Sequence, residues 1–252
     1  MAKCLAVVEY MGSPFHGFQV QPGVPTVQGE LEAAVGTITG RPTAVSGAGR
    51  TDAGVHAAGQ AVSFDVEDGA EPEALLAGLN AVLPRGLKVV SLRRVRDDFD
   101  PRRDALWREY RYFVLNRAAP GALLGDFTHH FRGTIDLELA RQACGTMVGA
   151  HDFGAFRASG SQAGSTWREV LLCDTRRLRG DVVLITVRAN AFLYRMARIM
   201  AGAVLEVASG RMSPVELLAH LDGGDVPCAA PLPAKGLFLW RVEYPDDITC
   251  GE

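Results

Sequence analysis

The order of strand and helix patterns constrains the fold of this chain more than any other feature of its sequence. Apolar runs and alternation predict strands at 3–11, 43–47, 60–66 and 87–95, and a helical period of apolar residues predicts helices at 27–38 and 71–83. The first part of the chain therefore reads strand, helix, strand, strand, helix, strand.

The same order returns in the second part of the chain. Strands are predicted at 107–115, 167–178, 181–189 and 237–244, and helices at 136–148, 191–208 and 213–221. Two successive units of this order are typical of the split βαβ, ferredoxin-like arrangement. The sequence therefore predicts an α+β protein of two such halves, 1–104 and 105–252, whose sheets combine around a central cleft that holds the site.

Composition fits an ordinary soluble protein. The chain has 252 residues, of which 48% are hydrophobic and 22% charged, and its mean hydropathy is +0.07. No apolar stretch is long enough for a bilayer span, and the apolar start meets Glu9 at once, so we expect no secretory signal, no membrane contact and a cytoplasmic location.

Metal binding is not expected. The five cysteines, at 4, 144, 173, 228 and 250, form no C-x-x-C pair and are typical of reduced, buried thiols. The adjacent His129 and His130 have no second ligand cluster nearby, which favours a surface loop over a metal site.

The net charge of −3 argues against a nucleic-acid partner, but the charge is unevenly distributed. Residues 85–117 hold ten basic and five acidic side chains, and residues 157–198 hold eight and three. Two basic blocks in an acidic frame are one way to build a local phosphate-binding surface. A genome that favours arginine codons would give the same arginine-rich pattern.

The densest local motif is GAGRTDAGVHAAGQ at 47–60. Its glycines allow backbone geometry that presents Arg50, Thr51 and Asp52 outward. Asp52 is a candidate catalytic carboxylate, with an Asx-turn as the purely structural alternative. His56 is a candidate partner or base, with an ordinary loop histidine as its alternative.

Two further segments carry candidate functional side chains. In WREYRY at 107–112, alternation places Tyr110 beside basic residues on a strand, which suits base stacking but also an ordinary core. In RANAFLYRMAR at 188–198, Arg195 and Arg198 would share one stripe of a helix with Phe192 or with Ala191, which suits an anionic partner but also a solvated face.

At the level of whole motifs, GAGRTDAGVHA at 47–57 resembles the signature of the tRNA pseudouridine synthase A (TruA) family. Other pieces resemble the family's motifs along the whole chain: Tyr10, Gly12, Phe15, Gly17, Phe18, Gln19 and Gln21; Val27-Gln28 and Leu31-Glu32; Asn80 and Leu83-Pro84; Asp97-Asp98-Phe99; Tyr110-Arg111-Tyr112; Asp152-Phe153 and Phe156; Ala189-Asn190-Ala191-Phe192, Met196 and Arg198; and Pro233-Ala234, Gly236-Leu237 and Leu239. The departures are small, since Phe18 stands where many members have Trp and Ala197 where many have Val.

The resemblance implies two ferredoxin-like halves with combined sheets, a homodimer, no cofactor, and isomerisation of uridine to pseudouridine at positions 38 to 40 of tRNA, in the anticodon stem-loop. Carried over by position, it makes Asp52 the catalytic aspartate, as nucleophile or general base, and Tyr110 the aromatic against the target base. Arg50 and Arg198 become the basic companions of that pair. A non-catalytic RNA-binding module on the same fold is the alternative, and a metal-dependent phosphotransferase using Asp52 a more remote one.

Overall fold

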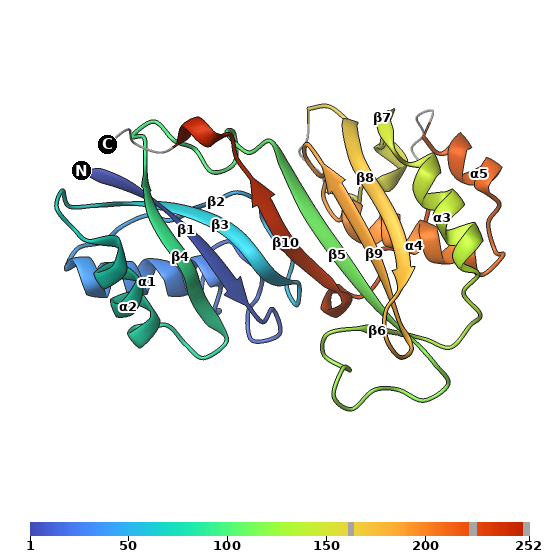
Figure 1. The fold of residues 1–252 in the computed structure, drawn as a ribbon, viewed down its shortest axis with the longest axis horizontal. Coiled ribbons are helices and arrows are strands. Elements are labelled where there is room, and N and C mark those ends of the chain that lie inside the picture. The colour runs from blue at the N-terminus through green and yellow to red at the C-terminus, as the bar shows by residue number, and fades with distance from the viewer. Residues whose placement is uncertain (161–163, 222–225, 249–252) are drawn as a thin grey trace. The chain divides into compact units, whose positions relative to one another are not determined.

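The computed structural model describes residues 1–160, 164–221 and 226–248, and the chain forms two compact units (Figure 1). The first unit consists of residues 1–106 and 239–252, and the second of residues 107–238. The α+β class expected from the sequence is confirmed, because both units combine helices with mainly antiparallel strands. Cys250 lies outside the described residues.

The first unit follows the predicted order closely. Its elements are β1 (Ala2–Tyr10), α1 (Val27–Thr39), β2 (Ser46–Gly47), β3 (His56–Val66), α2 (Pro72–Val82) and β4 (Leu87–Val95). The strand β10 (Leu237–Glu243), whose residues from 239 onward belong to this unit, lies next to β3. The sheet order is β4-β1-β3-β10, and β1 is antiparallel to both β3 and β4.

Both faces of this sheet are partly covered. Alternation along β1 directs Cys4, Ala6 and Val8, all fully buried, to one face. Helices α1 and α2 lie on one side of the sheet in Figure 1, and α2 packs on β4. On the opposite face Leu5 joins a small buried cluster that includes Ala61, Phe99 and Ile248, so the segments after β4 and β10 cover that end of the sheet.

The strands of the second unit also pair mainly in antiparallel fashion. Its elements are β5 (Trp107–Asn116), β6 (His129–Phe131), α3 (Leu137–Thr146), β7 (Gly149–Asp152), β8 (Trp167–Arg177), β9 (Val182–Ala189), α4 (Met196–Ala208) and α5 (Pro214–Ala219). The strand order is β5-β9-β8-β7, with the short β6 parallel to β5. Helix α4 is buried at nearly every position and packs against α3, which in turn covers β8.

The prediction of a helix over 191–208 is wrong at its start, because α4 begins only at Met196. The Asn190 side-chain oxygen accepts the N–H of Ala191 at 2.7 Å, a local bond that competes with helix formation. Arg195 then has a left-handed backbone with φ 59°, which a right-handed helix excludes. The expected helical stripe of Phe192, Arg195 and Arg198 therefore does not exist.

Smaller differences concern the strands. The strand expected at 43–47 is reduced to Ser46–Gly47, and the one expected at 60–66 begins earlier, at His56. Strands β6 and β7, which have three and four residues, were not predicted from the sequence. Among the residues that the structure describes, no helix combines the length and the hydropathy that a bilayer span requires.

Candidate active site

The loop between β2 and β3 presents Asp52 on a tight turn. The Asp52 carbonyl accepts the backbone N–H of Val55 at 3.1 Å, which closes the turn. Gly54, the third residue of that turn, has φ 80°, a left-handed value that favours glycine at this position of a type II turn. The glycine in the sequence G-R-T-D-A-G therefore shapes the segment that carries the carboxylate.

The turn is clamped by the loop that follows β1. The backbone N–H of Phe18 donates to the Thr51 carbonyl at 3.0 Å, and the Tyr10 and Thr51 hydroxyls share a buried hydrogen bond of 2.7 Å. At Gly12 a Cβ atom would lie 2.2 Å from the carbonyl oxygen of Val55, so only glycine allows this approach of the two backbones. The position of Asp52 is thus fixed by hydrogen bonds and by a backbone contact without spare room.

The side chains of the turn alternate in direction. Thr51 is buried, whereas Arg50 is exposed and Asp52 half-buried. The expectation that Thr51 points outward is therefore wrong, because its hydroxyl faces Tyr10 and anchors the turn. Arg50 and Asp52 are the two charged residues of this segment, and both are accessible to solvent.

His56, the first residue of β3, has a structural role in the clamp. Its ring is buried, and its Nδ1 accepts the backbone N–H of Gly12 at 3.0 Å. A ring nitrogen that accepts a backbone N–H holds its lone pair in that bond and is not available to take a proton from a substrate. Gln60 supports the same loop through a 2.7 Å bond from its amide nitrogen to the carbonyl of Gly49.

Tyr110 belongs to the second unit and lies on β5. Its side chain is 9% exposed, and its ring packs edge-on against Phe192 with 4.8 Å between the ring centroids. Such an edge-to-face pair holds an aromatic ring in one orientation. Phe192 was expected on a helix, but it lies in the irregular segment before α4, and this packing partner of Tyr110 was not foreseen from the sequence.

A backbone carbonyl of the second unit holds the Arg198 side chain in position. It lies in the first turn of α4, and its Nε donates to the carbonyl of Leu232 at 2.6 Å. The neighbouring Tyr112 donates its hydroxyl to the carbonyl of Pro233 at 2.8 Å. At Gly236 a Cβ atom would lie 2.7 Å from the ring of Tyr112, so a side chain at this position would collide with the ring.

The charge of Arg198 also affects the pKa of Tyr112. Burial raises the pKa of the Tyr112 hydroxyl well above its ordinary value, and the nearby Arg198 guanidinium partly offsets that rise. The Tyr112 hydroxyl therefore stays protonated at neutral pH and serves as a hydrogen-bond donor. The segment 232–236 thus orients both Arg198 and the aromatic ring beside it.

A buried carboxylate that the sequence analysis did not identify neutralises part of the basic blocks. Glu109 is 3% exposed and pairs with Arg111 at 3.0 Å and with Arg188 at 2.7 Å. The Arg188 guanidinium also stacks over the Trp107 ring, 4.1 Å from its centroid. Alternation along β5 puts Trp107, Glu109 and Arg111 on one face, but the pairing of β5 with β9 that brings Arg188 opposite Glu109 is a tertiary feature.

No group of three or more histidine, cysteine or acidic side chains that could hold a metal ion occurs among the described residues. Burial and the charges of Lys235 and His130 lower the pKa of His129. Cys4, Cys144, Cys173 and Cys228 are buried free thiols.

Comparison with known proteins gives a consistent result. The family model described as tRNA pseudouridine synthase matches residues 6–102 and 143–245. Curated proteins named tRNA pseudouridine synthase A are similar over almost the whole chain. The Methylobacterium sp. (strain 4-46) protein is 41% identical over 98% of this chain and 99% of its own length. The Aeromonas hydrophila protein is 40% identical over 96% and 90%, and the Brevibacillus brevis protein 38% identical over 97% and 100%.

The contact between Gly12 and Val55 predicts that Gly12→Ala destabilises the protein. The added methyl group must displace the backbone of the Asp52 turn, and overpacking of this kind costs about 1–3 kcal/mol of unfolding free energy. Urea denaturation of the variant and the parent measures the difference. Gly145→Ala is the matched control, because a Cβ at Gly145, in helix α3, meets nothing within 4 Å. Equal losses, or no loss, in the two variants would contradict the clamp.

Proposed function

Since the chain belongs to the tRNA pseudouridine synthase family, we propose that it isomerises uridine to pseudouridine in the anticodon stem-loop of tRNA, at positions 38, 39 and 40. Support comes first from the extent of the similarity, because relatives with this name align with nearly the whole chain. The observation that carries the proposal is the turn itself: a carboxylate partly open to solvent, on a backbone clamped by Gly12, Thr51 and His56.

The reaction rearranges one nucleotide and neither gains nor loses an atom. The target uridine leaves its stack and enters the site. The bond between N1 and C1′ breaks, the base turns, C5 joins C1′, and the proton on C5 is lost while N1 gains one. Asp52 acts in this sequence either as the nucleophile that attacks carbon or as the general base that takes the proton.

The other roles follow the family resemblance. Tyr110 stacks on the detached base and accepts or relays the proton of C5. Arg198 keeps Asp52 ionised as the base excludes water. Arg50 fills the place of the flipped base or holds a phosphate. In support, the Tyr110 ring is held by Phe192, Arg198 is anchored by the Leu232 carbonyl, and Arg50 is exposed on the turn of Asp52.

The wider arrangement is part of the proposal. Halves 1–104 and 105–252 are ferredoxin-like repeats of the chain order, their sheets combine around a central active-site cleft, and the protein acts as a cytoplasmic homodimer without a cofactor. The strand order β4-β1-β3, with β2 antiparallel to β3, supports a split βαβ topology for the first repeat. The order β5-β9-β8, with antiparallel pairing, supports the same for the second.

The substitution Asp52→Asn tests the catalytic role. Asparagine has nearly the same volume, and the turn is closed through the backbone of residue 52, so the loop keeps its shape. An amide is a poor nucleophile and a poor base, so pseudouridine formation falls below detection. Affinity for tRNA stays within a few-fold of the parent, because it depends mainly on phosphate contacts.

Melting temperature, tRNA affinity and pseudouridine yield are measured on one preparation. Asp65→Asn, an exposed aspartate of β3, is the matched control and keeps full activity. An active Asp52→Asn protein would remove the catalytic assignment. A parent protein that binds tRNA and forms no pseudouridine would instead indicate an RNA-binding module.

The substitution Tyr110→Phe separates stacking from proton transfer. The phenyl ring keeps its contact with Phe192, while the hydroxyl is lost. If Tyr110 takes part in proton transfer, the single-turnover rate falls by about 10²–10⁴-fold at unchanged tRNA affinity. Tyr194→Phe, which removes the hydroxyl of an exposed tyrosine, serves as the control. An unchanged rate for Tyr110→Phe would leave Tyr110 a stacking role only.

A further inference from the structure

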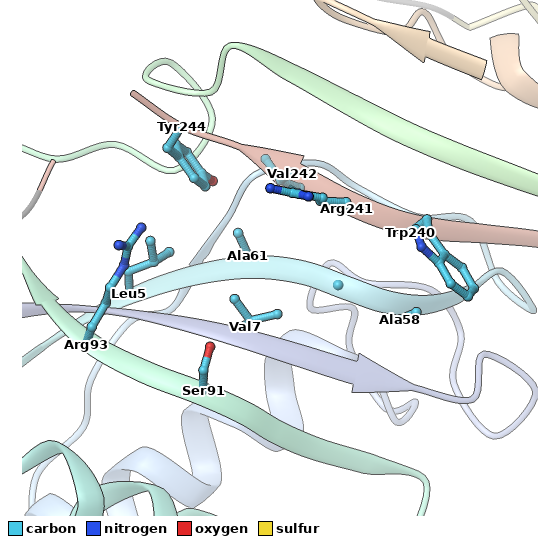
Figure 2. Close-up of a pocket in the computed structure, with 11 residues that line it drawn as sticks. Leu5, Val7, Ala58, Ala61, Ser91, Arg93, Trp240, Arg241, Val242 and Tyr244 are labelled. Atoms are coloured by element: carbon cyan, nitrogen blue, oxygen red, sulfur yellow. The ribbon is translucent and has the colours of Figure 1, made fainter. Parts of the chain in front are cut away.

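A shallow groove crosses the face of the first unit's sheet that lies opposite α1 and α2 (Figure 2). Its volume is about 440 Å³. The floor consists of small side chains on three neighbouring strands, and the rim carries arginine and aromatic side chains. All of its lining residues belong to the first unit.

The strand register explains why the groove forms. On one face of the sheet Val7 of β1 lies opposite Ala61 of β3 and Ser91 of β4, and all three side chains are small. At Gly59 a Cβ would lie 2.5 Å from the carbonyl oxygen of Trp240, so β3 and β10 approach closely there. With neighbouring strands about 4.8 Å apart, the four strands β10, β3, β1 and β4 span roughly 14 Å.

The rim provides cationic and aromatic groups. The side chain of Arg93, on β4, is exposed on the groove side and makes no ion pair or hydrogen bond with another described residue. Arg241 of β10 is exposed and pairs with Glu243 at 2.7 Å. Glu243 and Asp246 provide negative charge near Tyr244, whereas the part of the groove between Arg93 and Trp240 contains no acidic residue. Arginine side chains next to an aromatic ring suit single-stranded nucleic acid, because guanidinium groups bind its phosphates and the ring stacks on its bases.

Strand β3 connects the candidate catalytic turn to the groove. Strand β3 starts at His56, four positions after Asp52, and Ala58 lies at the end of the groove where Trp240 lies (Figure 2). Gly59, which also lines the groove, approaches the backbone of Trp240 closely. His56, the first residue of β3, also accepts the backbone N–H of Gly12, so the start of this strand is tied to the loop after β1. A strand of RNA that leaves the site along β3 would therefore enter the groove.

We propose that this groove binds a single-stranded segment of the RNA substrate next to the target uridine, with a base on Trp240 and phosphates at Arg93 and Arg241. The proposal rests on the proposed function and assigns a second contact to the same substrate. The shallow floor of small residues suits a base or a sugar lying flat. It offers no deep apolar pocket of the kind that anchors a protein partner.

The test compares the parent with Arg93→Ala in binding a labelled anticodon stem-loop transcript over a range of salt concentrations. Each phosphate contact to single-stranded RNA contributes about −0.7 to the slope of log K against log salt. The slope of Arg93→Ala is therefore shallower by about 0.7, and its Kd at about 0.1 M salt is roughly fivefold higher. Arg132→Ala, which removes an exposed arginine outside the groove and outside both basic blocks, keeps the parent's slope and Kd.

Pseudouridine yield and molecular mass are measured on the same samples. If the parent forms no pseudouridine, the proposed function fails, whatever the slope of Arg93→Ala. If the parent is active and Arg93→Ala keeps its slope and its Kd, the groove proposal alone is overturned. The same holds if Arg93→Ala binds RNA normally but changes the mass of the particle, because the face is then a protein interface.

Discussion

The close approach of two backbones at Gly12 and Val55 determines where the candidate catalytic carboxylate stands. A side chain at position 12 would overlap the Val55 carbonyl, and the surrounding hydrogen bonds to Thr51 and His56 leave the turn one arrangement. Preorganisation of this kind matters for catalysis, because a charged group already in position needs no reorganisation when the substrate reacts. Gly12 and the hydroxyl of Tyr10, the last residue of β1, therefore determine the position of the candidate carboxylate Asp52.

In the second unit, candidate site side chains are also held in fixed positions, here by backbone carbonyls and by ring packing. Backbone carbonyls at Leu232 and Pro233 take hydrogen bonds from Arg198 and Tyr112, and Phe192 supports the ring of Tyr110. A guanidinium held by a carbonyl retains donors for an anion while its position is fixed. Part of the arginine charge in the two basic blocks is not available in this way, since Arg111 and Arg188 both pair with the buried Glu109.

The sequence was sufficient to predict the α+β class, most elements and the loop of Asp52, because these depend on local periodicity and on glycine spacing. It did not predict the partners of that loop, since nothing local links Gly12 to Val55 or Tyr10 to Thr51 across some 40 positions. The start of α4 was misplaced because residues 191–195 have helical periodicity, whereas the Asn190 side chain and the left-handed Arg195 prevent a helix there. Strands as short as β6 and β7 carry too few residues for a pattern.

The most direct test of the account is the position of the product on tRNA. An unmodified tRNA transcript with uridines at positions 38, 39 and 40 is incubated with the protein, and pseudouridine is mapped nucleotide by nucleotide. A transcript with cytidine at those three positions serves as the control. The account predicts pseudouridine at positions 38 to 40 of the first transcript and none in the control. Pseudouridine at other positions only, or none despite tRNA binding, would contradict it.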